Sequence, residues 1–160
     1  MKAKKPPAAP KRRKPAPRDE ALAAALLMAR AADMRQADDI VVLHITDLTI
    51  IADYMVIMTG RNVPHLRAIS DELLKQAKSH GLHVFGLEGI DTIPTGDHKW
   101  VVLDLGSVIV HIFDADTRAY YDLELLWGDA PKIDWKRKSR RIAKKLLESR
   151  SEEGAEGSTA

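Results

Sequence analysis

A hairpin of two apolar strands is the feature that most constrains the fold. Residues 99–113, KWVVLDLGSVIVHIF, hold two apolar runs separated only by Gly106 and Ser107. A two-residue connection that begins with glycine is typical of a β-hairpin. Because both runs are too apolar to face water, the hairpin must lie in a sheet that is covered by other elements. The sequence therefore predicts helices packed on a central sheet.

The remaining elements follow from apolar periodicity and from turn residues. Helical spacing predicts helices at about 19–35 and 64–79, with Gly81 placed to cap the second. Runs rich in β-branched residues predict strands at 39–45, 53–60 and, more briefly, 83–89. Residues after Asp114 are expected to form one or two short helical turns. This order predicts an α/β domain with a mixed β-sheet of about five strands flanked by helices.

Charge is strongly segregated along the chain. Residues 1–18 contain eight Lys or Arg, five Pro and no acid, which predicts a disordered basic arm. Residues 19–131 carry eight basic and eighteen acidic side chains and are expected to form the folded domain. Residues 132–160 are expected to form a basic helix at 134–149 and an acidic, disordered tail. An acidic domain is therefore expected between two basic arms.

Composition excludes several classes of protein. The chain has no cysteine, which excludes disulfides, thiol catalysis and cysteine-ligated metal. It has no apolar run near the roughly 20 residues that span a bilayer, so no membrane association is predicted. No apolar block follows the basic N-terminus directly, which argues against a secretory signal. A mitochondrial presequence is disfavoured because residues 1–18 lack serine. The expected location is the cytoplasm.

A search for catalytic motifs predicts no active site. The sequence contains no HExxH, P-loop, GxSxG or GxGxxG pattern. Asp114 and Asp116 form a DxD pair at a strand end, an arrangement that can hold Mg²⁺ for nucleotidyl transfer. Such enzymes also need a Gly-Ser phosphate loop about ten residues earlier on a neighbouring strand, and the chain lacks one there. Turn and helix-capping roles are therefore favoured for both acids.

The histidines do not predict a metal site or a cofactor. His80 and His83 are three residues apart, but Gly81 between them at a helix end disfavours a shared face. His111 alternates with apolar neighbours in a strand, which favours a hydrogen-bonded histidine of the core or sheet.

One face of the hairpin leaves two interpretations open. Trp100, Val102 and Asp104 share that face, and a buried acid needs a partner. Either this mixed face contacts another molecule, or Trp100 packs under a helix while Asp104 pairs within the chain.

Three sequence blocks resemble a known family. DYMVIMTG (53–60), KWVVLDLGSVIVHIF (99–113) and RAYYDLELLWGDA (118–130) resemble the blocks of the ribosomal silencing factor family, also called Iojap-like, in order and spacing. The resemblance runs from about Asp19 to Ala130 and leaves out both basic arms. It departs from the family at Ser107, where an acid is usual. It implies a nucleotidyltransferase-like fold without the catalytic residues, and a protein that is not an enzyme.

The resemblance also implies a function. Members of the family bind the large ribosomal subunit through a ribosomal protein on the intersubunit face and sterically block joining of the small subunit. Translation is thereby repressed when nutrients are short, and family precedent suggests a homodimer off the ribosome. A large-subunit assembly factor with the same partner is the main alternative. A nucleotidyltransferase that uses Asp114 and Asp116 is a remote alternative.

Carry-over from the family gives the expected contact residues for the ribosomal protein. They are Trp100 in the WVVLD block and Tyr121 and Asp122 in the YYDLE block, and Asp104 matches a further motif position. An anionic side chain beside an aromatic ring suits Lys and Arg of a basic ribosomal protein.

Helical spacing divides the aromatic segment into two sets of residues. If residues 118–127 form a helix, Tyr120, Leu123 and Trp127 lie on one face and are expected to fill the core. Tyr121 and Asp122 then point outward.

The basic arms are expected to contact rRNA phosphates, because clustered cations bind phosphate with little sequence preference. The candidate residues are Lys11, Arg12, Arg13, Lys14, Lys136, Arg137, Lys138, Arg140 and Arg141.

Overall fold

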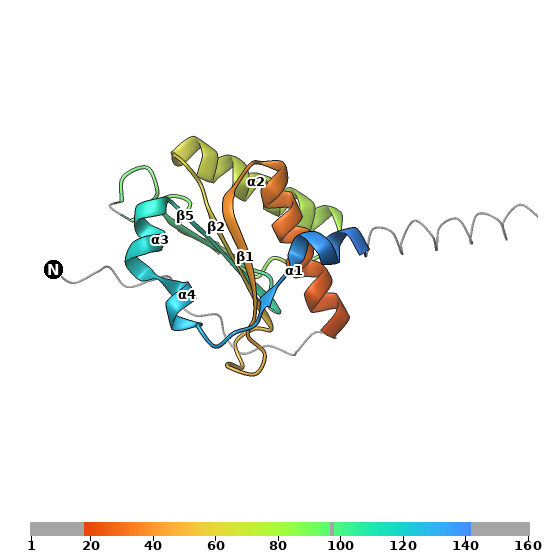
Figure 1. The fold of residues 1–160 in the computed structure, drawn as a ribbon. Coiled ribbons are helices and arrows are strands. Elements are labelled where there is room, and N and C mark those ends of the chain that lie inside the picture. Colours follow the sequence, from red (N-terminus) through yellow and green to blue (C-terminus); the bar gives the residue numbers. More distant parts are fainter. Residues whose placement is uncertain (1–17, 97, 142–160) are drawn as a thin grey trace, which may run out of the picture.

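The structure, a computed structural model, describes residues 18–96 and 98–141 (Figure 1). Four complete helices and six strands lie within these ranges, and residues 135–141 form a further helical stretch. The helices are α1 (Arg18–Met34), α2 (Val63–Ser79), α3 (Ala115–Tyr121) and α4 (Leu123–Leu126). The strands are β1 (Asp38–His44), β2 (Tyr54–Thr59), β3 (Gly86–Glu88), β4 (Trp100–Asp104), β5 (Val108–Phe113) and β6 (Lys132–Ile133).

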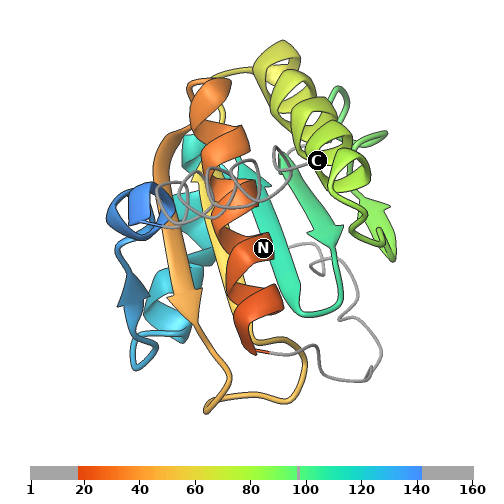
Figure 2. The ribbon, with the colours of Figure 1, turned by 90° about the vertical axis from the view of Figure 1, so that its right-hand side faces the viewer.

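The strands form one mixed sheet in the order β3-β4-β5-β2-β1-β6. The β2–β5 pair is parallel and the other four pairs are antiparallel. Helices α1 and α2 cover one face of the sheet (Figure 2). The predicted mixed α/β architecture is confirmed, but the sheet has six strands where about five were expected. The additional strand, β6, has only two residues, too few to produce a periodic pattern in the sequence.

The predicted hairpin is present as β4 and β5. Gly106 adopts a positive φ of 82°, which a residue with a side chain rarely accepts. A Cβ at this position would also lie 2.8 Å from the ring of Phe85. The backbone N–H of Gly106 donates to Oδ1 of Asp104 at 2.8 Å, so the strand's own last residue closes the turn.

Helix α2 is capped at both ends. The side chain of Asn62 accepts a hydrogen bond from the backbone N–H of His65 at 2.8 Å and caps the N-terminus. Gly81 follows the C-terminus with φ of 70°, and the N–H of Leu82 reaches back to Ala77 O at 2.9 Å. This pattern is a Schellman motif, so the predicted cap at Gly81 is confirmed.

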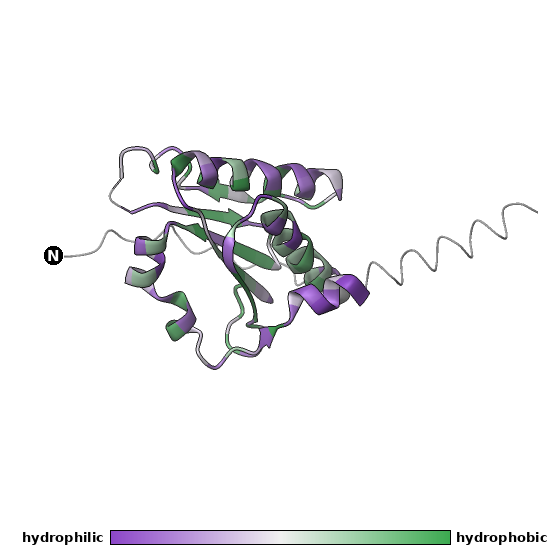
Figure 3. Ribbon diagram, turned by 45° about the horizontal axis from the view of Figure 1, so that its top comes forward, coloured by the Kyte–Doolittle hydropathy of each residue, from purple (hydrophilic) through white to green (hydrophobic). Residues whose placement is uncertain are grey.

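Both faces of the sheet are buried, because side chains alternate along each central strand. Odd and even positions of β5 enter different clusters, with Val110 on one face and Ile109 on the other. The strands are accordingly apolar along their length, while polar residues lie on the outer turns of the helices (Figure 3). This explains why the strand sequences lack the polar–apolar alternation of a sheet with one wet face.

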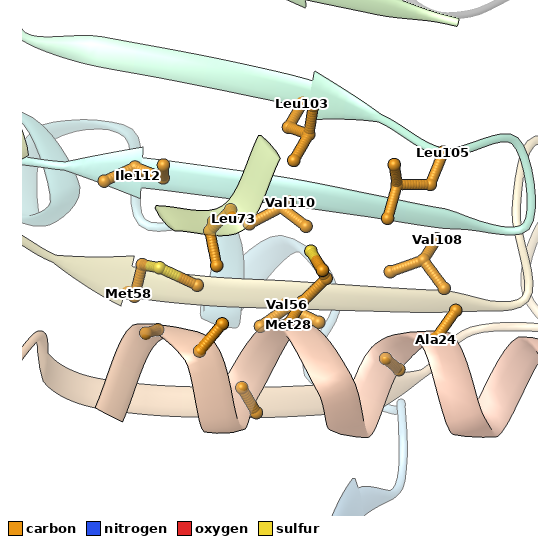
Figure 4. Close-up of a cluster of buried hydrophobic side chains, with 14 of the residues drawn as sticks. Ala24, Met28, Val56, Met58, Leu73, Leu103, Leu105, Val108, Val110 and Ile112 are labelled. Atoms are coloured by element: carbon orange, nitrogen blue, oxygen red, sulfur yellow. The ribbon is translucent and has the colours of Figure 1, made fainter. Parts of the chain in front are cut away.

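The first core cluster lies between the sheet and helices α1 and α2. Met28 of α1 and Leu73 of α2 point toward Val56 and Val110 of the sheet (Figure 4). The inner face of α1 is mostly alanine, whose small side chains let the helix approach the sheet and α2 closely. The fully or nearly fully buried alanines of α1 are Ala21, Ala24, Ala25, Ala29, Ala31 and Ala32.

The second cluster lies on the opposite face, under α3, α4 and the segment that follows them. Phe113, Trp100 and Ile57 of the sheet form its floor. Tyr121, Leu123 and Trp127, which come from or follow α3 and α4, pack onto that floor and close the cluster.

The two predicted arms lie largely outside the described residues. The N-terminal arm, apart from Arg18, and residues 142–160 are in that category, whereas residues 135–141 are helical as expected. Within the described ranges, no helix is long and apolar enough to cross a bilayer.

The close packing of α1 predicts that a larger side chain cannot be accepted on its inner face. Ala29→Leu places three additional carbons at a fully buried position, and we expect a loss of about 1–3 kcal/mol in the free energy of unfolding. Ala23→Leu at an exposed position of the same helix is the matched control, and should change stability by less than about 0.5 kcal/mol. Urea denaturation measures both, and equal effects would contradict the close packing.

Candidate protein-docking surface

Helix α3 begins at the DxD pair of the sequence. Oδ1 of Asp114 accepts a hydrogen bond from the N–H of Thr117 at 2.9 Å and caps the helix. Asp116 is exposed in the first turn, where an acid is favoured by the helix dipole. No group of three His, Asp or Glu among the described residues is arranged to hold a metal ion. The predicted capping role of Asp114 is confirmed.

A left-handed residue separates α3 from α4. Asp122 has φ of 43° and ψ of 59°, a conformation that aspartate tolerates better than most side chains. Its N–H donates to Arg118 O at 2.9 Å, which ends α3. Its Oδ1 accepts from the N–H of Leu125 at 3.3 Å, which begins α4. One residue therefore serves as the C-cap of one helix and the N-cap of the next.

This break exchanges the roles expected for the two tyrosines. Tyr120 was predicted to fill the core, and this prediction is wrong because its side chain is 57% exposed. Tyr121 was expected to point outward but is half-buried and packs on Trp100, with ring centroids 4.6 Å apart. Leu123 and Trp127 pack against the second core cluster as predicted. The helical phase assumed for residues 118–127 fails because those residues do not form one helix.

An aromatic cluster lies beneath α3. The indole Nε1 of Trp100 donates to Nδ1 of His111 at 3.0 Å, and the rings of Trp100 and Phe113 are 4.7 Å apart. Burial lowers the pKa of His111 to about 3, so the imidazole is neutral at physiological pH and its Nδ1 can accept. Burial also raises the pKa of the Tyr121 phenol, and neighbouring Tyr120 adds to that shift. The prediction of a hydrogen-bonded core histidine at 111 is confirmed.

Arg118 fastens α3 and α4 to the sheet. Its Nη1 donates to Asp39 O at 2.6 Å and to Thr59 Oγ1 at 2.9 Å. Its Nε and Nη2 donate to Oε1 of Glu124 at 2.9 and 2.6 Å. The guanidinium therefore joins α3 and α4 to the ends of β1 and β2. Arg118 is the only cation in residues 114–130, which carry five acids, and it is turned inward.

The outer side of α3 and α4 exposes apolar groups beside an acid. Leu125 and Leu126 are 77% and 71% exposed, and both Tyr120 and Asp122 are exposed on the adjoining residues. We call Tyr120, Asp122, Leu125 and Leu126 the α3–α4 surface. Exposed apolar side chains gathered on neighbouring short helices are typical of a protein-binding site.

The two leucines were missed in the sequence because an apolar LELL run is usually assigned to a core. The shortness of α4, which has four residues, is the signal that could have identified them. A single turn cannot bury side chains that project in every direction.

The structure places the other predicted contact residues in different surroundings. Trp100 is 8% exposed and lies under Tyr121, which agrees with packing beneath a helix. Asp104 is 9% exposed and lies at the opposite end of β4, where it closes the hairpin turn. The structure therefore brings Trp100 and Tyr121 together but not Asp104. Lys136, Arg137, Lys138, Arg140 and Arg141 are all exposed, and Lys11, Arg12, Arg13 and Lys14 lie outside the described residues.

Comparison with known proteins identifies the family. The sequence model described as "Ribosomal silencing factor during starvation" matches residues 18–159. This chain belongs to the ribosomal silencing factor family. The match extends beyond Ala130, where the resemblance of the sequence blocks was expected to end, and includes the basic C-terminal segment.

Individual relatives agree with this assignment. The ribosomal silencing factor RsfS of Bacillus subtilis is 41% identical over 108 residues, which cover 68% of this chain and 87% of that protein. The chloroplastic protein Iojap of Zea mays is 32% identical over 118 residues, covering 72% of this chain and 48% of that protein. A crystal structure of a Bacillus halodurans protein has a TM-score of 0.58 at 35% identity and covers 68% of this chain and 93% of that one. The name of the Bacillus subtilis relative, a silencing factor, describes a regulatory role.

The hydrogen bonds of Arg118 predict a large effect of its removal. Arg118→Met keeps an unbranched apolar stem but deletes every donor, and we expect a loss of about 2–3 kcal/mol in the free energy of unfolding. Amide hydrogen exchange should accelerate in α3 and α4 before it does in the sheet. Arg67→Met on the exposed side of α2 is the control, and an equal loss for both variants would contradict the role of Arg118.

Proposed function

We propose that this protein binds the large ribosomal subunit through a basic ribosomal protein on the intersubunit face. Bound there in the cytoplasm, it sterically blocks joining of the small subunit and represses translation under nutrient limitation. Membership of a family described as ribosomal silencing factors supports the outcome of this proposal. The α3–α4 surface supports the mode of binding.

The observation that carries the proposal is the exposure of Leu125 and Leu126 on a rigidly held pair of helices. Their exposed side chains give a partner apolar area to bury. The support beneath them is ordered, because Arg118 holds both helices and Tyr121 packs on Trp100. A surface ordered before binding loses little conformational entropy when the partner docks.

Charge favours a basic partner. The carboxylate of Asp122 lies next to the leucines and is exposed, and Asp129 is exposed at the end of the same segment. Arg118, the single cation of residues 114–130, is paired with Glu124. The charge that these residues present to solvent is therefore negative. Lys or Arg of a ribosomal protein would form charge-assisted hydrogen bonds there, and the acidic domain would attract such a partner from a distance.

Trp100 and Asp104 take supporting roles in this proposal. Trp100 positions Tyr121 from below through ring contact. Asp104 fixes the hairpin turn and thereby the register of β4. The contact residues at the surface are then Tyr120, Tyr121 and Asp122, with the two leucines.

Off the ribosome, a second copy of the chain would cover the same apolar side chains, which fits the homodimer expected from the family. The alternative role in assembly of the large subunit uses the same surface. It differs in the reaction that is affected, since an assembly factor need not prevent mature subunits from joining.

Subunit joining on sucrose gradients tests the proposal. Saturating wild-type protein should reduce the fraction of joined ribosomes formed from purified subunits. Leu125→Glu/Leu126→Glu should abolish this effect, because two carboxylates would have to be desolvated in the interface. Leu48→Glu/Ile50→Glu changes two exposed apolar residues in the β1–β2 connection and is the matched control. Normal joining at saturating wild-type protein would refute silencing, and binding without a block would favour assembly.

Two substitutions of Asp122 distinguish the contribution of its charge to binding from the contribution of its helix cap to stability. Asp122→Asn keeps the cap and tolerates the left-handed backbone, so stability should change by less than about 0.5 kcal/mol. Affinity for the large subunit should fall about tenfold, because a charge-assisted hydrogen bond is lost. Asp122→Ala loses the cap as well, and should reduce stability by about 2 kcal/mol. Co-sedimentation and thermal denaturation measure the two effects, and unchanged binding of the asparagine variant would exclude a charged contact.

A further inference from the structure

The chain after α4 crosses from one face of the sheet to the other. Ala130 is buried in the second core cluster, and Trp135 is buried in the first. Between them, β6 pairs with the outer edge of β1, opposite Val42 and Leu43. The C-terminal segment is therefore built into the sheet before its helical part begins at residue 135.

Trp135 anchors this helical part to the domain. Its side chain is only 9% exposed, and its Nε1 donates to Ile40 O at 3.1 Å. Asp134 caps the first turn, since its Oδ1 accepts from the N–H of Arg137 at 3.2 Å. Ser139, one turn after Trp135, is also buried. The inner side of helix 135–141 is thus fixed against α1, and its outer side has a defined direction.

The outer side of this segment is a cluster of cations that have no carboxylate partner among the described residues. Arg35, Arg61 and Arg118 elsewhere in the domain each lie within 4.0 Å of a carboxylate. None of the cations in residues 132–141 forms such a pair with a described residue. These exposed cations are Lys132, Lys136, Arg137, Lys138, Arg140 and Arg141.

Arg30 of α1 extends the cluster. It is exposed and lines a groove of about 380 Å³ together with Asp33, Trp135, Lys136, Ser139 and Arg140, so that three cations and one acid line the groove. Helix 135–141 is strongly hydrophilic and lies beside α1, away from α3 and α4 on the other face of the sheet (Figures 1 and 3). The basic cluster and the acidic α3–α4 surface therefore lie on different sides of the sheet.

We propose that helix 135–141 is a binding element for the phosphate backbone of structured RNA. Clustered Lys and Arg neutralise phosphates and release counterions, which requires no particular base sequence. Trp135 is the only aromatic residue in 132–141 and is buried, so no ring is available on which bases could stack. Recognition is consequently electrostatic and independent of sequence.

The same residues disfavour a membrane surface as the partner. A helix that binds lipid needs an exposed apolar face beside its cations. Within residues 135–141 the aromatic side chain is turned inward and every exposed side chain is charged. The identification of ribosomal RNA as the natural ligand rests on the proposed function. The affinity of helix 135–141 for RNA phosphate does not.

Binding of the full-length protein to a fluorescein-labelled duplex RNA of about 20 base pairs tests this proposal by anisotropy across about 50–250 mM KCl. Arg137→Gln/Lys138→Gln/Arg141→Gln removes three exposed cations and leaves Trp135 and the cap in place. Affinity should fall at least about tenfold at the lowest salt, and the slope of log K against log salt should become less steep by about 2–3. Arg67→Gln/Lys75→Gln/Lys78→Gln on exposed α2 positions is the matched control, with an expected change below about twofold.

Each other outcome overturns the proposal. Equal losses for the two triple variants would show a general effect of net charge. No binding of the wild type to the duplex would exclude the element. Loss of binding to vesicles containing phosphatidylserine, with RNA binding unchanged, would assign the cluster to a membrane. Because the duplex assay needs no ribosome, failure of the subunit-joining experiment leaves this result interpretable.

Discussion

The four hydrogen bonds of Arg118 hold together the part of the molecule that carries the proposed docking surface. One guanidinium reaches β1, β2 and α4 from a position on α3, so helices too short to be stable alone become part of the domain. Its acceptor on β1, Asp39, has a positive φ of 48°, which presents the carbonyl to the arginine at an irregular point of the β1–β2 ladder. The irregularity of β1 thus supplies the acceptor for the Arg118 guanidinium.

Rigid support of this kind allows apolar groups to remain exposed. Tyr121, the last residue of α3, packs on the indole of Trp100, which is itself oriented by a hydrogen bond to neutral His111. The backbone then turns at Asp122, so that Leu125 and Leu126 are directed away from the core. A surface that is ordered before binding can use its apolar area for affinity, because little of the binding free energy is spent on ordering side chains and backbone.

The two faces of the sheet carry surfaces of opposite charge. One carries the acidic α3–α4 surface, which suits a basic protein, and the other carries helix 135–141, which suits phosphate. The short strand β6 connects them along the edge of β1 and fixes their relative position. A ribosomal subunit presents both kinds of ligand, protein and RNA, so a protein with two such surfaces can bind it at two points. The family match extends to residue 159, so the C-terminal segment lies within the region that the family model describes.

Local features of this protein were determined by the sequence alone. Gly106 predicts the hairpin, Gly81 the end of α2, and Asp114 the cap of α3, because each acts through its own backbone or through atoms a few residues away. Apolar strands likewise predict a sheet covered on both faces. The blocks around Trp100 and Tyr121 were sufficient to suggest the family.

Only the tertiary structure decided which side chains of residues 118–130 face solvent. A left-handed aspartate at position 122 leaves no mark on apolar periodicity, yet it exchanges the roles of Tyr120 and Tyr121 and exposes Leu125. The two-residue strand β6 and the burial of Trp135 depend on the edge of β1, about ninety residues earlier in the chain. Contacts between distant segments are set by packing and hydrogen bonding in three dimensions, which no local pattern of residues encodes.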